Sequence, residues 1–395
     1  MTSSPLTDAE LEALRAATPG WGDSVHLNHA GASLMSVASL GAIREHLELE
    51  SRLGPMDAAQ AVGPQLAQLR SDAARLLNAG IDEVAILGSG SAAFGAVWAA
   101  LPPLRSGDRI LVSRQEWGGN LVTYQRSADR AGARVEMLPC LPDGRVDIES
   151  TAAVLDERVR WLSLTWLPAN GGLINDAAAL GRLARAAVVP YFIDAGQAVG
   201  QLPVDVQELG CDVLKSAARK HLRGPRGTAL LYVRNSFVDG LDPRWVDVQS
   251  APWPGGLRPG ARRFETAEQS VALWRGLQPA LALTLQLGVD VIAQRVQALA
   301  AQLREQLACV RGVTVRDESE GPRSGLVSFT VEGLLASDVQ AALSRQGIRV
   351  GANGVPYTPW DMQARSLNGI VRASLSYLNS EADLDKLADA LTQLH

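Results

Sequence analysis

Lysine is rare in this chain, which otherwise carries its positive charge on arginine. Lys215, Lys220 and Lys386 are the only lysines among 37 Lys and Arg residues. An amine can lose its proton and form a Schiff base, whereas a guanidinium stays protonated. Lys220 stands out because Asp194 and Gln197 precede it at the end of an apolar run, and open α/β sheets place their sites at such strand ends. The pattern favours a nucleophilic lysine at position 220.

The order of residues around Lys220 resembles that of a known enzyme group. Asp194 and Gln197 are followed by Arg219 and Lys220, and then by a Gly-Pro-Arg-Gly turn. This order is similar to the class V aminotransferase group of pyridoxal-phosphate (PLP) enzymes, along nearly the whole chain. The group includes cysteine desulfurases, C–S lyases, isopenicillin-epimerase-like proteins and ergothioneine-pathway lyases. The resemblance implies a fold-type I enzyme with PLP as its cofactor.

The resemblance also assigns roles to single residues. It implies that Lys220 bonds to the PLP aldehyde as a Schiff base, and that Asp194 pairs with the ring nitrogen, so that the ring can withdraw electrons from a substrate Cα. Gln197 is expected to bond the phenolic oxygen of PLP. The other expected cofactor contacts are Gly90, Ser91, Trp117, Asn170, Arg219 and Thr266. The expected substrate contacts are Arg372, His29 and Tyr357.

Three of these matches also have a physical reason. Gly90 and Ser91 open a helix after the strand 84–87, and the free N–H groups and positive dipole end of a helix bind phosphate. Trp117 offers a π face for stacking on the pyridine ring, or it fills the core as one of nine Trp. Arg372 interrupts an apolar strand, where its guanidinium needs a carboxylate from the substrate or from an acid at a domain interface.

The remaining matches leave alternatives open. Alignment from the following glycines puts Ala169 nearer the cofactor than Asn170. His29 lies in a stretch of small residues that also fits a tight turn. Tyr357 is suited to proton transfer or to packing. Thr266 could offer its hydroxyl to the PLP phosphate of a neighbouring subunit, as the resemblance implies, and the enzyme would then be an obligate homodimer.

The expected chemistry begins with removal of a substrate Cα proton by the freed Lys220 amine, whose pKa should be lowered by burial and by Arg219. Loss of a β-sulfur group would follow in a C–S lyase, reprotonation on the cofactor in an aminotransferase, and reprotonation on the other Cα face in an epimerase. Similarity to the ergothioneine-type lyases favours β-elimination from a cysteine conjugate or sulfoxide. The loop 351–360 contains no cysteine, so the sequence disfavours a persulfide-forming desulfurase.

Two interpretations from another class remain: an inactive relative with this fold, and a Rossmann-like nucleotide-binding protein. The combination of Asp194, Lys220 and Arg372 argues against an inactive relative. A nucleotide-binding protein should show a glycine fingerprint with an acidic residue about 20 positions later, and none is convincing here. The sequence identifies an amino acid as the substrate class without identifying which one.

The elements that must position these residues alternate between apolar strands and amphipathic helices. This alternation predicts an α/β fold with a mainly parallel sheet, to which the resemblance adds seven strands and a smaller α+β C-terminal domain. A stretch rich in Pro, Gly and Arg at 251–263 marks the boundary. We expect an N-terminal helical segment (1–22), a large PLP-binding domain (23–255) and a small domain (256–395). A long helical stretch is expected over about 267–307.

Composition excludes several function classes. A net charge of −5 gives no electrostatic reason to expect nucleic acid or anionic membrane as a partner. The first residues lack the basic and apolar regions of a secretory signal, and no apolar run has the length of a membrane span, which favours a cytoplasmic protein. Cys140, Cys211 and Cys309 form no CxxC pair, and His26 and His29 lack accompanying ligands, so neither a disulfide framework nor a metal site is expected.

Overall fold

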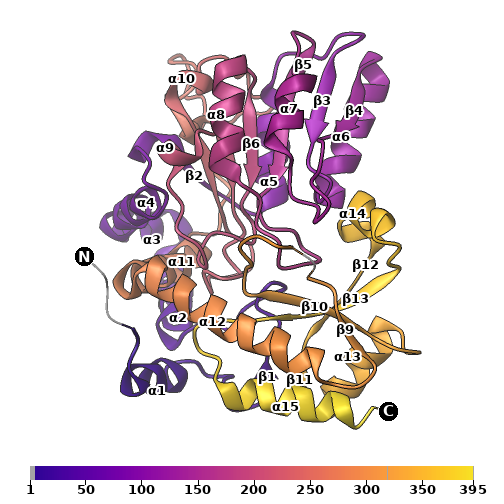
Figure 1. The fold of residues 1–395 in the computed structure, drawn as a ribbon. Helices are drawn as coiled ribbons and strands as arrows, with labels where there is room; N and C mark the ends of the chain where they lie inside the picture. Colours follow the sequence, from indigo (N-terminus) through magenta and orange to yellow (C-terminus); the bar gives the residue numbers. More distant parts are fainter. Residues whose placement is uncertain (1–4, 318, 395) are drawn as a thin grey trace.

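The computed structural model describes residues 5–317 and 319–394. Figure 1 shows two α/β units, one in each half of the molecule. The larger is built on a seven-stranded sheet and the smaller on a four-stranded sheet. A further two-stranded sheet joins β1 (Val25–His26) to β11 (Ile348–Arg349) in parallel register beside the smaller unit.

The seven-stranded sheet is mainly parallel, which confirms the predicted fold class. Its strands are, in spatial order, β2 (Val84–Leu87), β8 (Ala229–Val233), β7 (Val213–Lys215), β6 (Tyr191–Asp194), β5 (Val159–Thr165), β3 (Arg109–Val112) and β4 (Arg134–Met137). The strands from β7 to β4 pair in parallel, while β8 is antiparallel to both neighbours. The central strands are apolar runs because both faces of the sheet are covered by helices.

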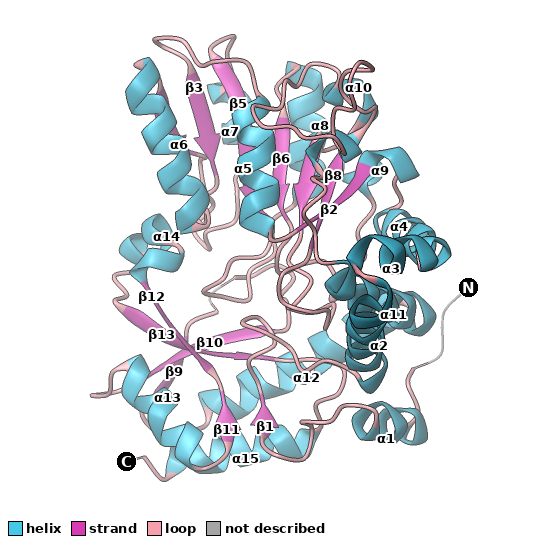
Figure 2. Cartoon of the chain, turned by 180° about the vertical axis from the view of Figure 1, so that it is seen from behind, coloured by secondary structure: helices cyan, strands magenta, loops and turns pink. Residues whose placement is uncertain are grey.

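Helices pack on the two faces of this sheet and form separate hydrophobic cores. Figure 2 shows α5 (Gly90–Ala100) and α6 (Gly118–Ala131) on the face opposite to α8 (Ala177–Ala187). Trp161 and Phe192 point toward the α5 and α6 side, and their neighbours Leu162 and Ile193 point toward the α8 side. This alternation along each strand fixes which residues reach the cores. The shorter helices of this unit are α7 (Ile148–Val154), α9 (Val206–Leu209) and α10 (Asn235–Val238).

The smaller unit is an antiparallel sheet covered by helices. Its strand order is β12 (Gly351–Gly354), β13 (Gly369–Ser374), β10 (Leu326–Val331) and β9 (Val313–Val315). Its helices are α12 (Val289–Ala308), α13 (Ala336–Arg345), α14 (Pro359–Ala364) and α15 (Glu381–Thr392). Helix α1 (Asp8–Ala16) begins with a capping box, in which Thr7 and Glu10 cap each other. Short 3-10 turns occupy Ile81–Glu83, Ala261–Phe264 and Val355–Tyr357.

The helical stretch expected over about 267–307 forms two helices with a break at Gly288. Helix α11 (Val271–Leu287) ends at Gly288, whose φ of 81° is left-handed, and the axis of α12 is turned by 81° from that of α11. Helix α11 packs beside α2 (Val37–Leu53) and α4 (Gly63–Leu77), with α3 (Pro55–Ala61) between the latter two in sequence.

The domain boundaries stay a prediction. β1, which precedes the large sheet, pairs with a strand of the smaller unit, and α11, which follows residue 256, contributes Leu277 and Leu281 to a core of the large sheet. Within the described ranges, no single helix is long and apolar enough to cross a membrane, and the bent pair α11 and α12 meets the criteria only by combined length and composition.

A buried ion pair connects the two units. Arg304 on α12 donates to Asp317 at 2.8 Å and to the carbonyl oxygens of Ser324 and Leu326. Asp317 also accepts from the backbone N–H of Gly172, which follows β5 of the large sheet. Both charged side chains are almost fully buried, at 7% and 0% exposure. Removing one partner therefore leaves the other charge without compensation.

We expect Arg304→Leu to lower the free energy of unfolding by about 3 kcal/mol, because the Asp317 carboxylate would remain buried and unpaired. Urea titration followed by circular dichroism measures the loss. Arg244→Leu is the matched control, since Arg244 pairs with Asp242 at 3.8 Å while both side chains are more than half exposed. The control should change stability by no more than about 0.5 kcal/mol. Equal losses in both variants would contradict the prediction.

Candidate functional site

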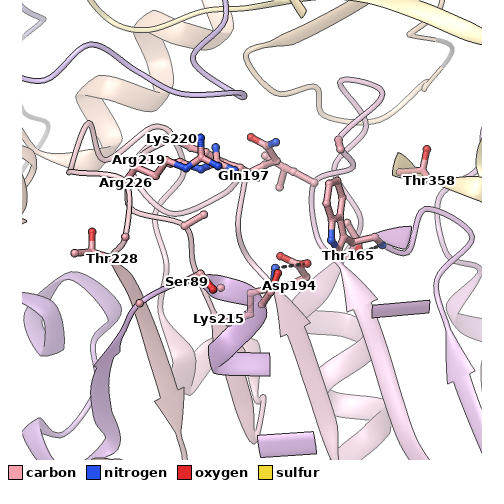
Figure 3. A pocket seen from close by; sticks show the side chains of 18 of the residues that line it. Ser89, Thr165, Asp194, Gln197, Lys215, Arg219, Lys220, Arg226, Thr228 and Thr358 are labelled. Atoms are coloured by element: carbon pink, nitrogen blue, oxygen red, sulfur yellow. Dashed lines mark hydrogen bonds and ion pairs between the residues drawn. The ribbon is translucent and has the colours of Figure 1, made fainter. Parts of the chain in front are cut away.

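A cavity of about 290 Å³ opens at the carboxyl ends of β5, β6 and β7. It brings together most of the cofactor-site residues expected from the sequence, as Figure 3 shows in part. Lys220 lies in its lining together with Gly90, Ser91, Trp117, Asp194, Gln197 and Arg219. Because parallel strands end at the same edge of a sheet, side chains distant in sequence converge here.

Lys220 lies in a tight turn after β7, where its N–H donates to the Ala217 carbonyl oxygen. Burial, and then the nearby Lys215 ammonium, lower the pKa of Lys220 to about 7, against the opposing charge of Asp194. The sequence led us to expect this effect from Arg219. Arg219 also lowers the pKa of Lys220, but by less than Lys215 does. A lysine with this pKa is largely neutral just above pH 7, so it can act as a nucleophile or as a base.

The Asp194 carboxylate is held by three donors at the end of β6. The backbone N–H of Gly196 donates to Oδ1 at 3.0 Å, while the Asn120 amide at 3.1 Å and the Lys215 Nζ at 2.6 Å approach Oδ2. Figure 3 shows Asp194 and Lys215 side by side at the strand ends. The carboxylate is buried and fixed in orientation, which suits the predicted pairing with a cationic ring nitrogen.

A second buried carboxyl group, Glu116, lies close to Asp194 and was not expected from the sequence. It accepts from Ser163 Oγ at 2.5 Å and from Thr165 Oγ1 at 3.1 Å. The Asn120 amide donates to both carboxyl groups and bridges them. Burial raises the pKa of Glu116 to about 7, against the hydrogen bond from Ser163, which lowers it. The only signal in the sequence is a Glu and an Asn four residues apart beside Trp117.

The N-terminus of α5 forms a close-fitting cradle. Ser89 caps the helix by accepting from the Ala92 N–H at 3.0 Å. A Cβ on Gly90 would lie only 2.6 Å from the Ser216 carbonyl oxygen, so no other residue fits there without a shift of the backbone. Arg226 lines the same cavity. Free N–H groups at a helix end next to a guanidinium form a phosphate site, so the residues present fit PLP.

Trp117 and Tyr357 differ in their relation to the cavity. The Trp117 ring lines it and contacts the Tyr357 ring edge-on, with the centroids 5.4 Å apart. Tyr357 is 39% exposed and does not contribute to the lining. The stacking role of Trp117 and the substrate role of Tyr357 both stay predictions.

Three other residues expected at the site do not line the cavity. Asn170 is buried and donates to Thr358 Oγ1 at 3.0 Å, whereas Ala169, the other candidate from the alignment, does line it. The Thr266 hydroxyl accepts from Gln269 outside the cavity. His29 is fully buried against Ser33, and burial holds its pKa well below the usual value, so it is neutral.

Arg372 also lies just outside the lining, on β13 of the smaller unit. Its guanidinium donates to the Ala169 carbonyl oxygen at 2.7 Å and to Asn28 Oδ1 at 3.3 Å. Burial lowers the pKa of Arg372 to about 10. Among the residues described, no carboxylate lies within ion-pair distance of Arg372, and its Nε has no hydrogen-bond partner. A buried cation without a counter-ion suits the predicted binding of a substrate carboxylate.

The chain matches known proteins over most of its length. A model of the family described as "Aminotransferase class-V" matches residues 27–387. The "Cysteine desulfurase" of Salmonella agona is 31% identical over 301 residues, 74% of this chain and 72% of that protein. The "Probable cysteine desulfurase" of Xylella fastidiosa is 28% identical over 332 residues, 82% of this chain and 79% of that protein.

Solved structures with the same fold cover almost all of the chain. The apo cysteine desulfurase of Thermococcus onnurineus NA1 superposes with a TM-score of 0.90 at 23% identity, over 100% of this chain and 99% of that one. A mutant of C-DES with glycine covalently linked to its PLP cofactor superposes with a TM-score of 0.86 at 24% identity, over 96% and 98%. At this identity, the likeness to these structures establishes the fold.

The function expected from the sequence is wrong. β-Elimination by a C–S lyase was favoured and a desulfurase disfavoured, whereas these relatives are named cysteine desulfurases. A cysteine on the loop 351–360 could only receive the sulfur and would take no part in weakening a C–S bond, so its absence does not exclude a desulfurase.

We expect Lys220→Ala to lose the covalent bond to PLP, because no other amine of the site is expected to reach the aldehyde. The absorbance band at about 420 nm should disappear, and borohydride reduction should fix no PLP to the protein. Lys386→Ala, the same change in an exposed lysine on α15, should retain both properties. Reduced PLP found on the Lys215 peptide of the wild type would contradict the assignment.

We expect Glu116→Gln to change how stability depends on pH. Between its unfolded value and about 7, Glu116 is protonated in the folded state and ionised in the unfolded state. The folded wild type therefore binds more protons and loses stability as the pH rises through this range. The variant lacks this loss, so its stability relative to wild type should rise by about 2 to 3 kcal/mol between about pH 5 and about pH 8. Urea titration of the cofactor-free proteins measures the difference, and a constant difference would contradict the prediction.

Proposed function

This chain belongs to the class V aminotransferase family, and on that premise we propose that it is a cysteine desulfurase. It is a PLP-dependent enzyme, and bound PLP supplies the electron-withdrawing ring that stabilises negative charge at a substrate Cα. The observation that carries the proposal is the 31% identity to a curated cysteine desulfurase over 74% of the chain. The cavity around Lys220 supports it, because it contains the groups that such chemistry needs.

Each residue has a defined task in this proposal. Lys220 would hold PLP covalently, and its neutral amine would take the proton from the Cα of a bound substrate. Its pKa of about 7 suits both tasks near neutral pH. Asp194 orients the ring through its nitrogen, and the α5 N-terminus with Arg226 holds the phosphate. Arg372 binds the carboxylate of the amino-acid substrate, since its guanidinium is buried without a counter-ion.

The sulfur acceptor is proposed to be a thiol from outside the chain. All three cysteines are described, and none of them lines the cavity. Cys211 is buried, and burial raises the pKa of its thiol, so it does not supply a thiolate. Cys140 is half-buried beyond β4, and Cys309 lies at the far end of α12. The proposed reaction converts cysteine and an acceptor thiol into alanine and a persulfide, with one sulfur atom transferred.

A homodimer is proposed for the same enzyme. Thr266 lies outside the cavity of its own subunit, which suits the predicted contact with a neighbour's cofactor. The segment before it exposes large apolar side chains, including Trp245 at 74%, Val248 at 76% and Trp253 at 95%. Exposed large apolar side chains within one segment are typical of a protein interface.

We expect the PLP-loaded protein to release sulfide and alanine in equal amounts from L-cysteine when dithiothreitol is the acceptor. Single Cys→Ala variants at 140, 211 and 309 should retain turnover within about twofold, because the acceptor is external. Lys220→Ala should be inactive and serves as the control for uncatalysed release. Pyruvate and ammonia in place of alanine would contradict the proposal, and so would a complete loss of turnover in one cysteine variant.

A further inference from the structure

Lys215 is a second lysine within the cofactor cavity, beside Lys220. Two of the three lysines of the chain therefore line one cavity. Lys215 is the last residue of β7, and its side chain is only 9% exposed. Surface lysines are solvated, so a buried amine in this position calls for a specific reason.

The position of Lys215 follows from the register of the sheet. On the neighbouring parallel strands β6 and β7, Asp194 and Lys215 are direct partners. The side chain passes under the start of α5, where a Cβ on Gly90 would lie 3.1 Å from Lys215 Cδ. Its Nζ ends 2.6 Å from Asp194 Oδ2. A glycine at position 90 and a short-range ion pair thus hold the amine at the carboxylate that is expected to orient the cofactor.

The amines of the two cavity lysines both lie close to Gly196. A Cβ on this glycine would be 3.5 Å from Lys220 Nζ and 3.7 Å from Lys215 Nζ. A cation this close disfavours a second positive charge, and a neighbouring cationic group is a known way to obtain a neutral, nucleophilic lysine. The Lys215 amine is itself paired with the Asp194 carboxylate, at 2.6 Å.

The other charged groups that face Lys220 do not replace this effect. Arg219 on the same turn and Arg372 on β13 also favour the neutral amine, but the effect of each is smaller than that of Lys215. Asp194 acts in the opposite direction. The adjacent His221 is buried, and burial lowers its pKa to about 3, so it carries no charge near neutral pH.

We propose that Lys215 is a positioning residue of the cofactor site, whose ammonium group holds the Asp194 carboxylate and keeps the Lys220 amine neutral. Only a neutral amine has the lone pair that adds to the PLP aldehyde carbon; a water molecule then leaves as the C–N double bond forms. A methionine or serine at 215 would leave Asp194 free to attract a proton onto Lys220. The role concerns the cofactor and is independent of which sulfur reaction follows.

The test is the pH dependence of the reaction between cofactor-free protein and PLP, followed by the absorbance of the covalent product at about 420 nm. The wild-type rate should rise with pH around a midpoint near 7. In Lys215→Met the midpoint should move upward by about one pH unit or more, because a cation is removed and Asp194 is left unpaired. Lys386→Met removes an amine from the exposed surface of α15 and should leave the midpoint unchanged.

An unchanged or lower midpoint in Lys215→Met would overturn the proposal, since a merely structural role would alter the amount of bound PLP without this shift. If Lys215→Met does not fold, a measurement on the wild type tests the proposal instead. Competitive acetylation of the cofactor-free protein, read by mass spectrometry, should label Lys220 with a midpoint near pH 7 while Lys215 remains largely unlabelled. Labelling of Lys215 at a lower pH than Lys220 would show that Lys215 is the neutral amine, and would equally overturn it.

Discussion

The ion pair between Lys215 and Asp194 is the interaction on which the cavity depends. It joins the ends of two neighbouring strands at 2.6 Å, and both side chains are almost fully buried. Burying either charge alone would cost several kcal/mol, so each makes the position of the other possible. The ion pair also affects Lys220, whose amine likewise lies close to Gly196. Among the neighbouring charges, Lys215 has the largest effect on the pKa of Lys220.

The fold supplies this arrangement through parallel strands that end together. Asp194 ends β6, Lys215 ends β7, and Glu116 follows β3, so three ionisable side chains meet at one edge of the sheet. Asn120, on the helix that follows Glu116, donates to both carboxyl groups and bridges them. The smaller unit contributes Arg372 from β13, and the pair Arg304–Asp317 fixes that unit against the loop after β5. The site thus depends on contacts between units as well as on the sheet.

Local patterns in the sequence were sufficient to predict the large sheet and to single out Lys220, which lines the cavity. The run 84–87 becomes β2 without change, since a strand buried on both faces is an uninterrupted apolar run. The glycine at position 288 did not predict the break between α11 and α12, because a single glycine within a helical pattern is often tolerated. The scarcity of lysine that singled out Lys220 applied equally to Lys215. What the sequence lacked was the register that sets Lys215 opposite Asp194, 21 residues earlier, because pairing between strands is decided by the packing of the whole sheet.

In the proposed desulfurase reaction, breaking the C–S bond and accepting the sulfur are separate requirements. Breaking a C–S bond requires a base at the substrate Cα, an electron-withdrawing cofactor and a cation for the carboxylate. Lys220, the cavity and Arg372 are proposed for these tasks. Lys220 lies in the turn after β7, and Arg372 lies on β13 of the four-stranded sheet. A sulfur acceptor is a separate requirement, since a thiol that diffuses into an open cavity satisfies the same chemistry as a thiol on a loop. The absence of cysteine from 351–360 therefore bears on the acceptor and leaves the cleavage step unaffected.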